Sequence, residues 1–369
     1  MLYFGSPTYT RFRDQTNERI RNKKKLVVID YGAESRSIVT CLNQAFGAAG
    51  WPWSRDFLNA YIGLAFVFSM REDGGGVWHL ENYEWSYFPE VLESLGDNIE
   101  MFNSKLKGKN PDSPEVYSKA KVDAWDAVRE AIDSGLPPVV WQPMGKEILK
   151  TKRVNMLYAR EWALPRKGQR PYLWSLITGY DESTQRYLID SEASYGKFAI
   201  GWDAFGTSDP VNWFCVMIIK PHTKPFNAYA AHRLVIQRAI EASQGMRPAN
   251  TGEAKAHGLA AWELWLESLR ERSRVSMVFA KEHASFLRSY RRAAAVYLRE
   301  IEQHFPEGTR AHLHSAAEHY DAISEEMIKL KDLDAEGVLD VDSCTEFVSQ
   351  AFKHEKAALA ALQNVLDTG

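Results

Sequence analysis

The sequence predicts an α+β protein of two domains, a mixed domain over residues 1–225 and an all-α domain over residues 226–369. Three observations support this. Side chains alternate with a period of two through Trp174–Thr178, which is typical of a β-strand. Pro221–Pro225 then breaks the chain, which places the domain boundary there. From Asn227 onward, hydrophobic residues recur at helical spacing almost throughout.

The length and composition fit this division. A chain of 369 residues is long enough for two domains of roughly 100–200 residues each. Hydrophobic residues make up 45% and charged residues 25%, as in an ordinary globular protein. The 12 tryptophans predict a core or cleft rich in large side chains. The net charge of −3 gives no electrostatic reason to expect a nucleic-acid or membrane partner.

The three cysteines, Cys41, Cys215 and Cys344, are too few for a disulfide framework and predict a reducing, cytoplasmic location. Residues 1–6 lack the charged start and apolar core of a signal peptide. The longest apolar run, Tyr61–Phe68, is far shorter than the roughly 20 residues that span a bilayer. We therefore expect no membrane and no nucleic-acid partner, and leave a homo-oligomer open.

The first domain should alternate strands with helices. Gly179–Ser183 has turn chemistry and should connect two strands as a hairpin. The expected strands are Leu26–Asp30, Pro137–Gln142, Tyr172–Thr178, Tyr187–Asp190 and Trp213–Lys220. The expected helices are Cys41–Gly50, Phe88–Leu95 and Ala124–Ser134. Cys215 lies inside an apolar strand and is expected to fill the core.

The hairpin and the upstream cysteine resemble the papain-like cysteine peptidases, especially the bacteriocin-leader-processing peptidases and the butirosin biosynthesis protein H family. In those families a strand carries a histidine five residues before the glycine of a Gly-Tyr-Asp turn, and the next strand carries an acid. Gly179–Asp181 matches the turn and Asp190 matches the acid. The histidine position is occupied by Trp174. The resemblance implies a papain-like fold in which a helix carrying Cys41 packs on an antiparallel sheet.

The resemblance also implies roles for site residues. Cys41 would be the nucleophile or its relic, because an early position in a helix favours a thiolate. Asp190 would be the orienting acid or its relic. Trp174 would line the cleft, since an indole has a donor N–H and no basic nitrogen. The remaining candidates for the cleft lining are Ser37, Gln44, His79 and Ser175.

Three functions remain open. The first is a catalytically degenerate domain that binds a peptide, an acyl group or a carrier protein in the cleft. The second is an acyltransferase or amidase that uses Cys41 with a base from outside the expected strand, such as His79 or a histidine of the helical domain. The third is an interaction scaffold in which Cys41 is a buried structural residue. The missing histidine favours the first, and a general protease is the least favoured.

No cofactor or metal is expected. His314 and Glu318 are four residues apart and would share a helix face, but two ligands do not make a zinc site. Gly74–Gly76 is not followed by the Lys-Ser or Lys-Thr pair of a phosphate-binding loop.

Overall fold

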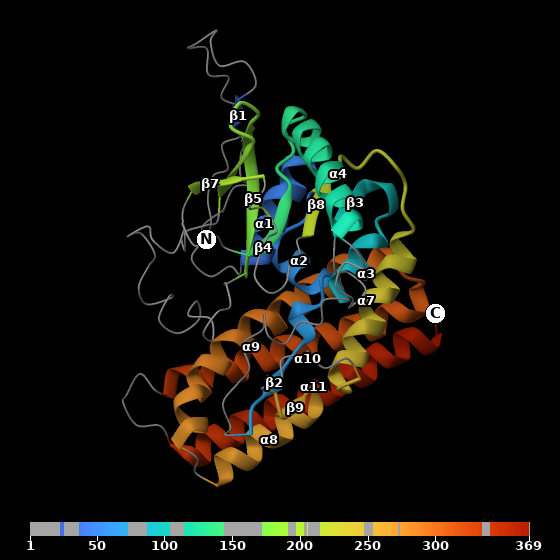
Figure 1. Cartoon of the computed structure of the whole chain (residues 1–369). Helices are drawn as coiled ribbons and strands as arrows, with labels where there is room; N and C mark the ends of the chain where they lie inside the picture. The colour runs from blue at the N-terminus through green and yellow to red at the C-terminus, as the bar shows by residue number, and fades with distance from the viewer. Residues whose placement is uncertain are drawn as a thin grey trace. The chain divides into compact units, whose positions relative to one another are not determined.

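The structure is a computed structural model (Figure 1). It describes residues 23–25, 37–72, 87–103, 114–143, 172–190, 197–202, 205, 215–246, 254–271, 274–333 and 340–368. The expected strand Leu26–Asp30 lies outside the described residues, and so does His79.

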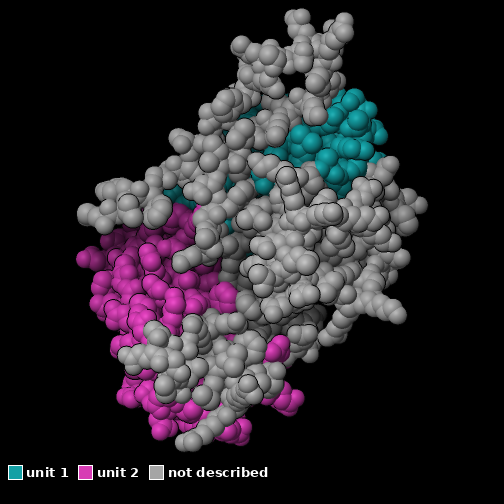
Figure 2. All heavy atoms as spheres, turned by 90° about the vertical axis from the view of Figure 1, so that its left-hand side faces the viewer, with its two compact units in different colours: residues 1–53, 96–225 teal, residues 54–95, 226–369 magenta. Residues whose placement is uncertain are grey.

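The chain divides into two compact units, coloured teal and magenta in Figure 2. Unit 1 comprises Met1–Trp53 and Gly96–Pro225, and unit 2 comprises Ser54–Leu95 and Phe226–Gly369. The sequence-based division assigned residues 54–95 to the first domain, whereas their contacts assign them to the second unit. The physical reason is aromatic packing, because Phe57 lies 5.1 Å from Tyr297 and Phe66 lies 5.8 Å from Tyr320, measured between ring centroids.

Unit 1 is built on a seven-stranded sheet in the order β3-β8-β4-β5-β6-β7, with β1 also paired to β5. Every described pair of neighbouring strands in this sheet is antiparallel. The strands are β1 (Lys23–Lys25), β3 (Ile99–Asn103), β4 (Val139–Pro143), β5 (Tyr172–Asp181), β6 (Arg186–Asp190), β7 (Lys197–Gly201) and β8 (Cys215–Ile219). The α+β expectation is confirmed at this level.

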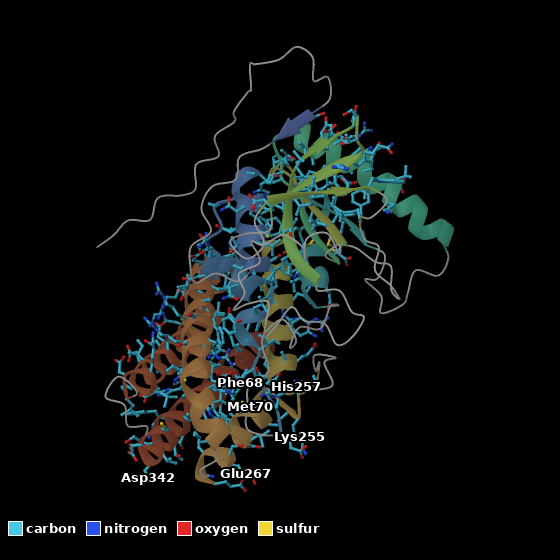
Figure 3. The ribbon with its side chains drawn as sticks, turned by 60° about the vertical axis from the view of Figure 1, so that its left-hand side comes forward. Phe68, Met70, Lys255, His257, Glu267 and Asp342 are labelled. Atoms are coloured by element: carbon cyan, nitrogen blue, oxygen red, sulfur yellow. The ribbon has the colours of Figure 1, made fainter. Side chains whose placement is uncertain are left out.

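Two helices of unit 1 cover the two faces of this sheet. Helix α4 (Pro114–Asp133) packs Val128 and Ile132 into a core with Val140, Ile177 and Val216 of the sheet. Helix α1 (Ser37–Ala48) packs against β4, β5 and β8 and contributes no residue to that core. Figure 3 shows α1 in blue and α4 in green on opposite sides of the sheet.

The β5–β6 hairpin is present, but its turn lies later than the sequence suggested. Strand β5 continues through Gly179 to Asp181, and residues 182–185 form the turn. A bulge between Ile177 and Gly179 lets the glycine stay in the strand. Tyr180 then points to the α4 face, where its hydroxyl donates to both carboxylate oxygens of Asp133 at 3.1 and 3.2 Å. The Gly-Tyr-Asp motif therefore anchors the hairpin to α4.

Unit 2 is mainly helical, as the stripes after Asn227 predicted. Its helices are α2 (Arg55–Tyr61), α3 (Tyr87–Glu93), α7 (Ala228–Ser243), α8 (Leu259–Arg270), α9 (Arg274–Ile301), α10 (Glu307–Asp332) and α11 (Val341–Thr368), with short 3₁₀ turns at Leu64–Phe66 and Glu302–His304. Helix α10 packs along both α9 and α11. Among the described residues, no helix is long and apolar enough to cross a bilayer.

A small two-stranded sheet in unit 2 joins segments far apart in sequence. Strands β2 (Ser69–Met70) and β9 (Ala256–His257) pair antiparallel, with Ser69 directly opposite His257. Figure 3 labels Met70 and His257 of the two strands. Their side chains bond across the pair, with 2.8 Å between Ser69 Oγ and His257 Nδ1. The next residue, Gly258, has a φ of +58°, and a Cβ there would lie 2.0 Å from the carbonyl oxygen of Ser243. Only glycine fits this close approach.

A buried ion pair holds three segments of unit 2 together. Arg291 of α9 is 0% exposed and Glu355 of α11 is 2% exposed. Two guanidinium nitrogens donate to the two carboxylate oxygens at 2.8 Å each, and a third donates to the carbonyl of Ala65. The guanidinium also lies over the ring of Tyr320. This bidentate arrangement satisfies both buried charges.

We predict that Glu355→Ala lowers the free energy of unfolding by about 3–5 kcal/mol, because it leaves the Arg291 charge buried without its counter-ion. The control is Asp321→Ala, which removes the partner of Arg299 from an ion pair about 40% exposed on both sides, and should cost no more than about 1 kcal/mol. Urea denaturation measures both. Equal losses in the two variants would contradict the prediction.

A second buried polar group in unit 2 is His232 of α7, which lies among Phe57, Tyr61 and Tyr297. Its Nδ1 is 3.0 Å from the hydroxyl of Tyr297. Burial, and to a smaller degree the nearby His304, lowers the pKa of His232 to about 3. The ring is therefore neutral in the folded protein at neutral pH.

This lowered pKa predicts a loss of stability in acid. The unfolded chain binds a proton at His232 below about pH 6.5, and the folded chain does not until about pH 3. Above pH 6.5 the neutral ring costs no stability. Between about pH 6.5 and pH 3, the free energy of unfolding falls by about 1.4 kcal/mol for each pH unit, because only the unfolded chain binds the proton. His232→Asn should reduce the difference in unfolding free energy between pH 7 and pH 5, measured in urea. An unchanged difference would show that His232 is protonated in the folded state.

Candidate functional site

Trp174 and Asp190 lie on the same face of the unit 1 sheet. Ile177 and Ile189 are paired across β5 and β6, and both belong to the core under α4. Side chains alternate between faces along a strand, so Leu176 and Trp174 face away from α4. Asp190 is paired with Leu176 and therefore shares that face. The two positions that the resemblance assigns to base and acid are thus brought to one side of the sheet.

Cys41 lies in the helix that covers this face. It is the fifth residue of α1, which begins at Ser37 and packs against β5. Only the first four N–H groups of a helix are left without partners inside it. A helix stabilises a thiolate most strongly at its N-terminus, and Cys41 lies about one turn beyond that point. The cysteine is placed early in its helix, as expected, but not at its start.

All three residues are buried. The exposed fraction is 1% for Cys41, 3% for Trp174 and 2% for Asp190. A nucleophilic sulfur must reach a substrate carbon, and general bases act within about 3 Å of the proton that they remove. In this conformation all three side chains are closed off from solvent, Trp174 and Asp190 on the sheet face that α1 covers and Cys41 in α1 itself. This arrangement favours a structural or ligand-supporting role over nucleophilic attack.

The other cleft candidates divide between the two faces. Gln44 follows Cys41 by three residues in α1 and is fully buried. Ser175 is paired with Val140, a residue of the core under α4, so it faces the opposite side of the sheet from Trp174. It therefore does not line a site with Cys41, because β-strand alternation separates adjacent residues. Ser37 is the first residue of α1, and its side chain lies outside the described residues.

The histidines do not supply the missing base within unit 1. His222 is the only histidine in the sequence of this unit, since His79 belongs to the segment assigned to unit 2. The His222 ring stacks on Trp51, with 4.5 Å between ring centroids. Trp51 follows the C-terminal end of α1 and donates its indole N–H to the carbonyl of Lys220. The sequence did not predict this stack, because Trp51 follows α1 and His222 follows β8, and only the packing of α1 on β8 brings the two residues together.

Cys215 has the role that its sequence context indicated. It lies opposite Trp141, which is itself opposite Trp174, so all three positions share the face covered by α1. Cys215 is completely buried, and burial raises the pKa of its thiol to about 12. A thiol that resists ionisation in this way acts as a small hydrophobic side chain.

Within the described ranges, no three histidine, cysteine, aspartate or glutamate side chains cluster closely enough to hold a metal ion. The candidate residues of unit 1 are thus an indole and a carboxylate on one face of the sheet and a cysteine in the helix that covers this face. No protein-family model matches this sequence, and neither does any curated protein.

Proposed function

We propose that unit 1 is a papain-like domain that has lost catalysis and acts by binding a peptide, an acyl group or a carrier protein. The observation that carries this proposal is that Trp174, which the resemblance aligns with the catalytic histidine, lies on the sheet face covered by α1. An indole cannot accept the thiol proton. It can offer a large apolar surface and one N–H donor to a ligand or to the helix above it.

The antiparallel sheet and the helix carrying Cys41 support the papain-like fold, because the family packs such a helix on such a sheet. The resemblance supplies the ligand class, since related domains hold peptides or carrier-bound acyl groups between the helix and the hairpin. We also propose a cytoplasmic location. Cys41, Cys215 and Cys344 are all buried and are not joined to one another by disulfides, as in a reducing compartment.

Acyl transfer through Cys41 is the second candidate. Asp190 favours it, because this buried acid, which the resemblance aligns with the orienting carboxylate of an active enzyme, shares a sheet face with Trp174. It still requires a base. His222 stacks on Trp51, which follows the C-terminal end of α1, whereas Cys41 lies near its N-terminal end. The base would therefore have to come from outside unit 1.

The proposal predicts that Cys41 is not an activated nucleophile. In the native protein, alkylation of Cys41 should be as slow as that of Cys215 and Cys344, which are 0% and 1% exposed. Labelling of Cys41 should increase only above about pH 8, where an ordinary thiol ionises. Peptide mass spectrometry between pH 6 and pH 9 measures all three rates in one sample. The control is the protein in urea, where the three cysteines should react alike.

Fast labelling of Cys41 alone near pH 6 would reject the proposal in favour of acyl transfer. An acyl-pantetheine thioester then provides the direct assay, because an active Cys41 would gain the mass of the acyl group. The binding proposal predicts no such gain.

The alignment onto the histidine position can be tested by restoring the base. We predict that Trp174→His raises the alkylation rate of Cys41 near pH 7 at least tenfold over Trp174→Phe, because an imidazole there could accept the thiol proton. Both substitutions remove indole volume, so Trp174→Phe controls for easier entry of the reagent. Equal rates in the two variants would show that position 174 is not aimed at the sulfur.

A further inference from the structure

A pair of histidines lies across two helices of unit 2, far from Cys41 in sequence. His319 of α10 and His354 of α11 point their Nδ1 atoms at each other, with 3.1 Å between the two nitrogens. Helices α10 and α11 pack along each other (Figure 1). His319 and His354 are both partly exposed. The sequence showed His319 as one of several histidines on a helix, but only the helix pairing brings His354 to it.

The spacing of these nitrogens suits a metal ion. Zinc–nitrogen bonds are about 2.0–2.1 Å long, so two imidazoles in neighbouring positions around one ion place their nitrogens roughly 2.9–3.4 Å apart, depending on the bond angle. The observed 3.1 Å falls inside this range. Imidazole nitrogen suits zinc, copper and nickel and does not suit magnesium or calcium.

One hydrogen lies between the two rings. Two Nδ1 atoms this close cannot both carry a hydrogen, so in the neutral pair one ring donates to the other. An entering ion replaces the shared hydrogen: the donor ring's single proton moves from Nδ1 to Nε2, where the acceptor ring already carries its own.

Glu318 adds a negative charge beside the pair. Its carboxylate acts on His319 electrostatically and lies 3.3 Å from Nε2 of His314. His314 itself is 57% exposed and lies between Glu302 and Glu318. The pair that the sequence singled out, His314 and Glu318, is therefore an exposed contact within one helix, whereas the histidine pair joins two helices.

We propose that His319 and His354 form a two-histidine site for a borderline divalent transition-metal ion, with Cu²⁺ bound more tightly than Zn²⁺ and water in the remaining positions. Two protein ligands are too few for a closed structural zinc site, so the ion would be held weakly and would exchange with solvent. The order of affinities follows the general preference of nitrogen ligands among these ions. The bound ion bridges α10 and α11 and therefore stabilises unit 2, because a ligand that binds only the folded state shifts the folding equilibrium. This inference is independent of the function proposed for unit 1.

The test measures the binding of Zn²⁺ and Cu²⁺ to the full chain. Equilibrium dialysis gives the affinity, and the melting temperature gives the effect on stability. His319→Ala and His354→Ala should each weaken Zn²⁺ binding at least tenfold and remove the rise in melting temperature that Zn²⁺ causes. The matched control is His314→Ala, on the same helix and more exposed, which should change neither. His354→Gln serves as a second variant that keeps the size and polarity of the side chain.

Electron paramagnetic resonance of the Cu²⁺ complex gives a second measurement. The spectrum should show coupling to imidazole nitrogen that each single substitution at position 319 or 354 alters. The proposal is overturned if His314→Ala abolishes binding while His319→Ala does not. It is equally overturned if the wild-type protein binds no Zn²⁺ at millimolar concentration, in which case the pair is only a hydrogen bond between rings.

Discussion

The placement of strand β5 between its neighbours determines the organisation of unit 1. This ten-residue strand pairs with β4 along its first half, with β1 at its end and with β6 on its other edge. A shift of one residue in any of these pairings would exchange the two faces of the strand. Trp174 would then turn toward α4, and Ile177 would leave the core that it shares with Val216. The register thus fixes the core and the candidate site together.

Local patterns predicted the elements well because each depends on neighbouring residues. The alternation at Trp174–Thr178, the apolar run at Cys215 and the helical stripes after Asn227 all correspond to observed strands and helices. The turn was placed too early because glycine and aspartate are typical of turns, whereas here a bulge keeps Gly179 in the strand. The hydroxyl of Tyr180 donates to Asp133 and so holds the extended end of β5 in place. The two residues are 47 positions apart, so no local pattern reveals this contact.

Long-range pairing explains what the sequence did not predict at the sites. Asp190 could be aligned with Trp174 from the hairpin alone, and strand alternation alone separates Ser175 from Trp174. The pairing of Ser175 with Val140 shows which of the two faces lies under α4. His222 stacks on Trp51 across 171 positions of the sequence, and His319 approaches His354 across 35 positions. Such contacts depend on helix and strand packing, which one sequence does not specify.

The division of the chain has a consequence for its synthesis. Residues 54–95 carry Phe57, Phe66 and Phe68, whose aromatic partners Tyr297, Tyr320 and Trp262 are made more than 160 residues later. At about 5–20 residues per second, the ribosome takes on the order of ten seconds or more to supply them. During that interval these aromatic side chains lack their final partners, while the last strand of the unit 1 sheet is already being completed. The nascent chain therefore has to keep an apolar segment from aggregating, or from packing on the wrong unit, until the bundle arrives.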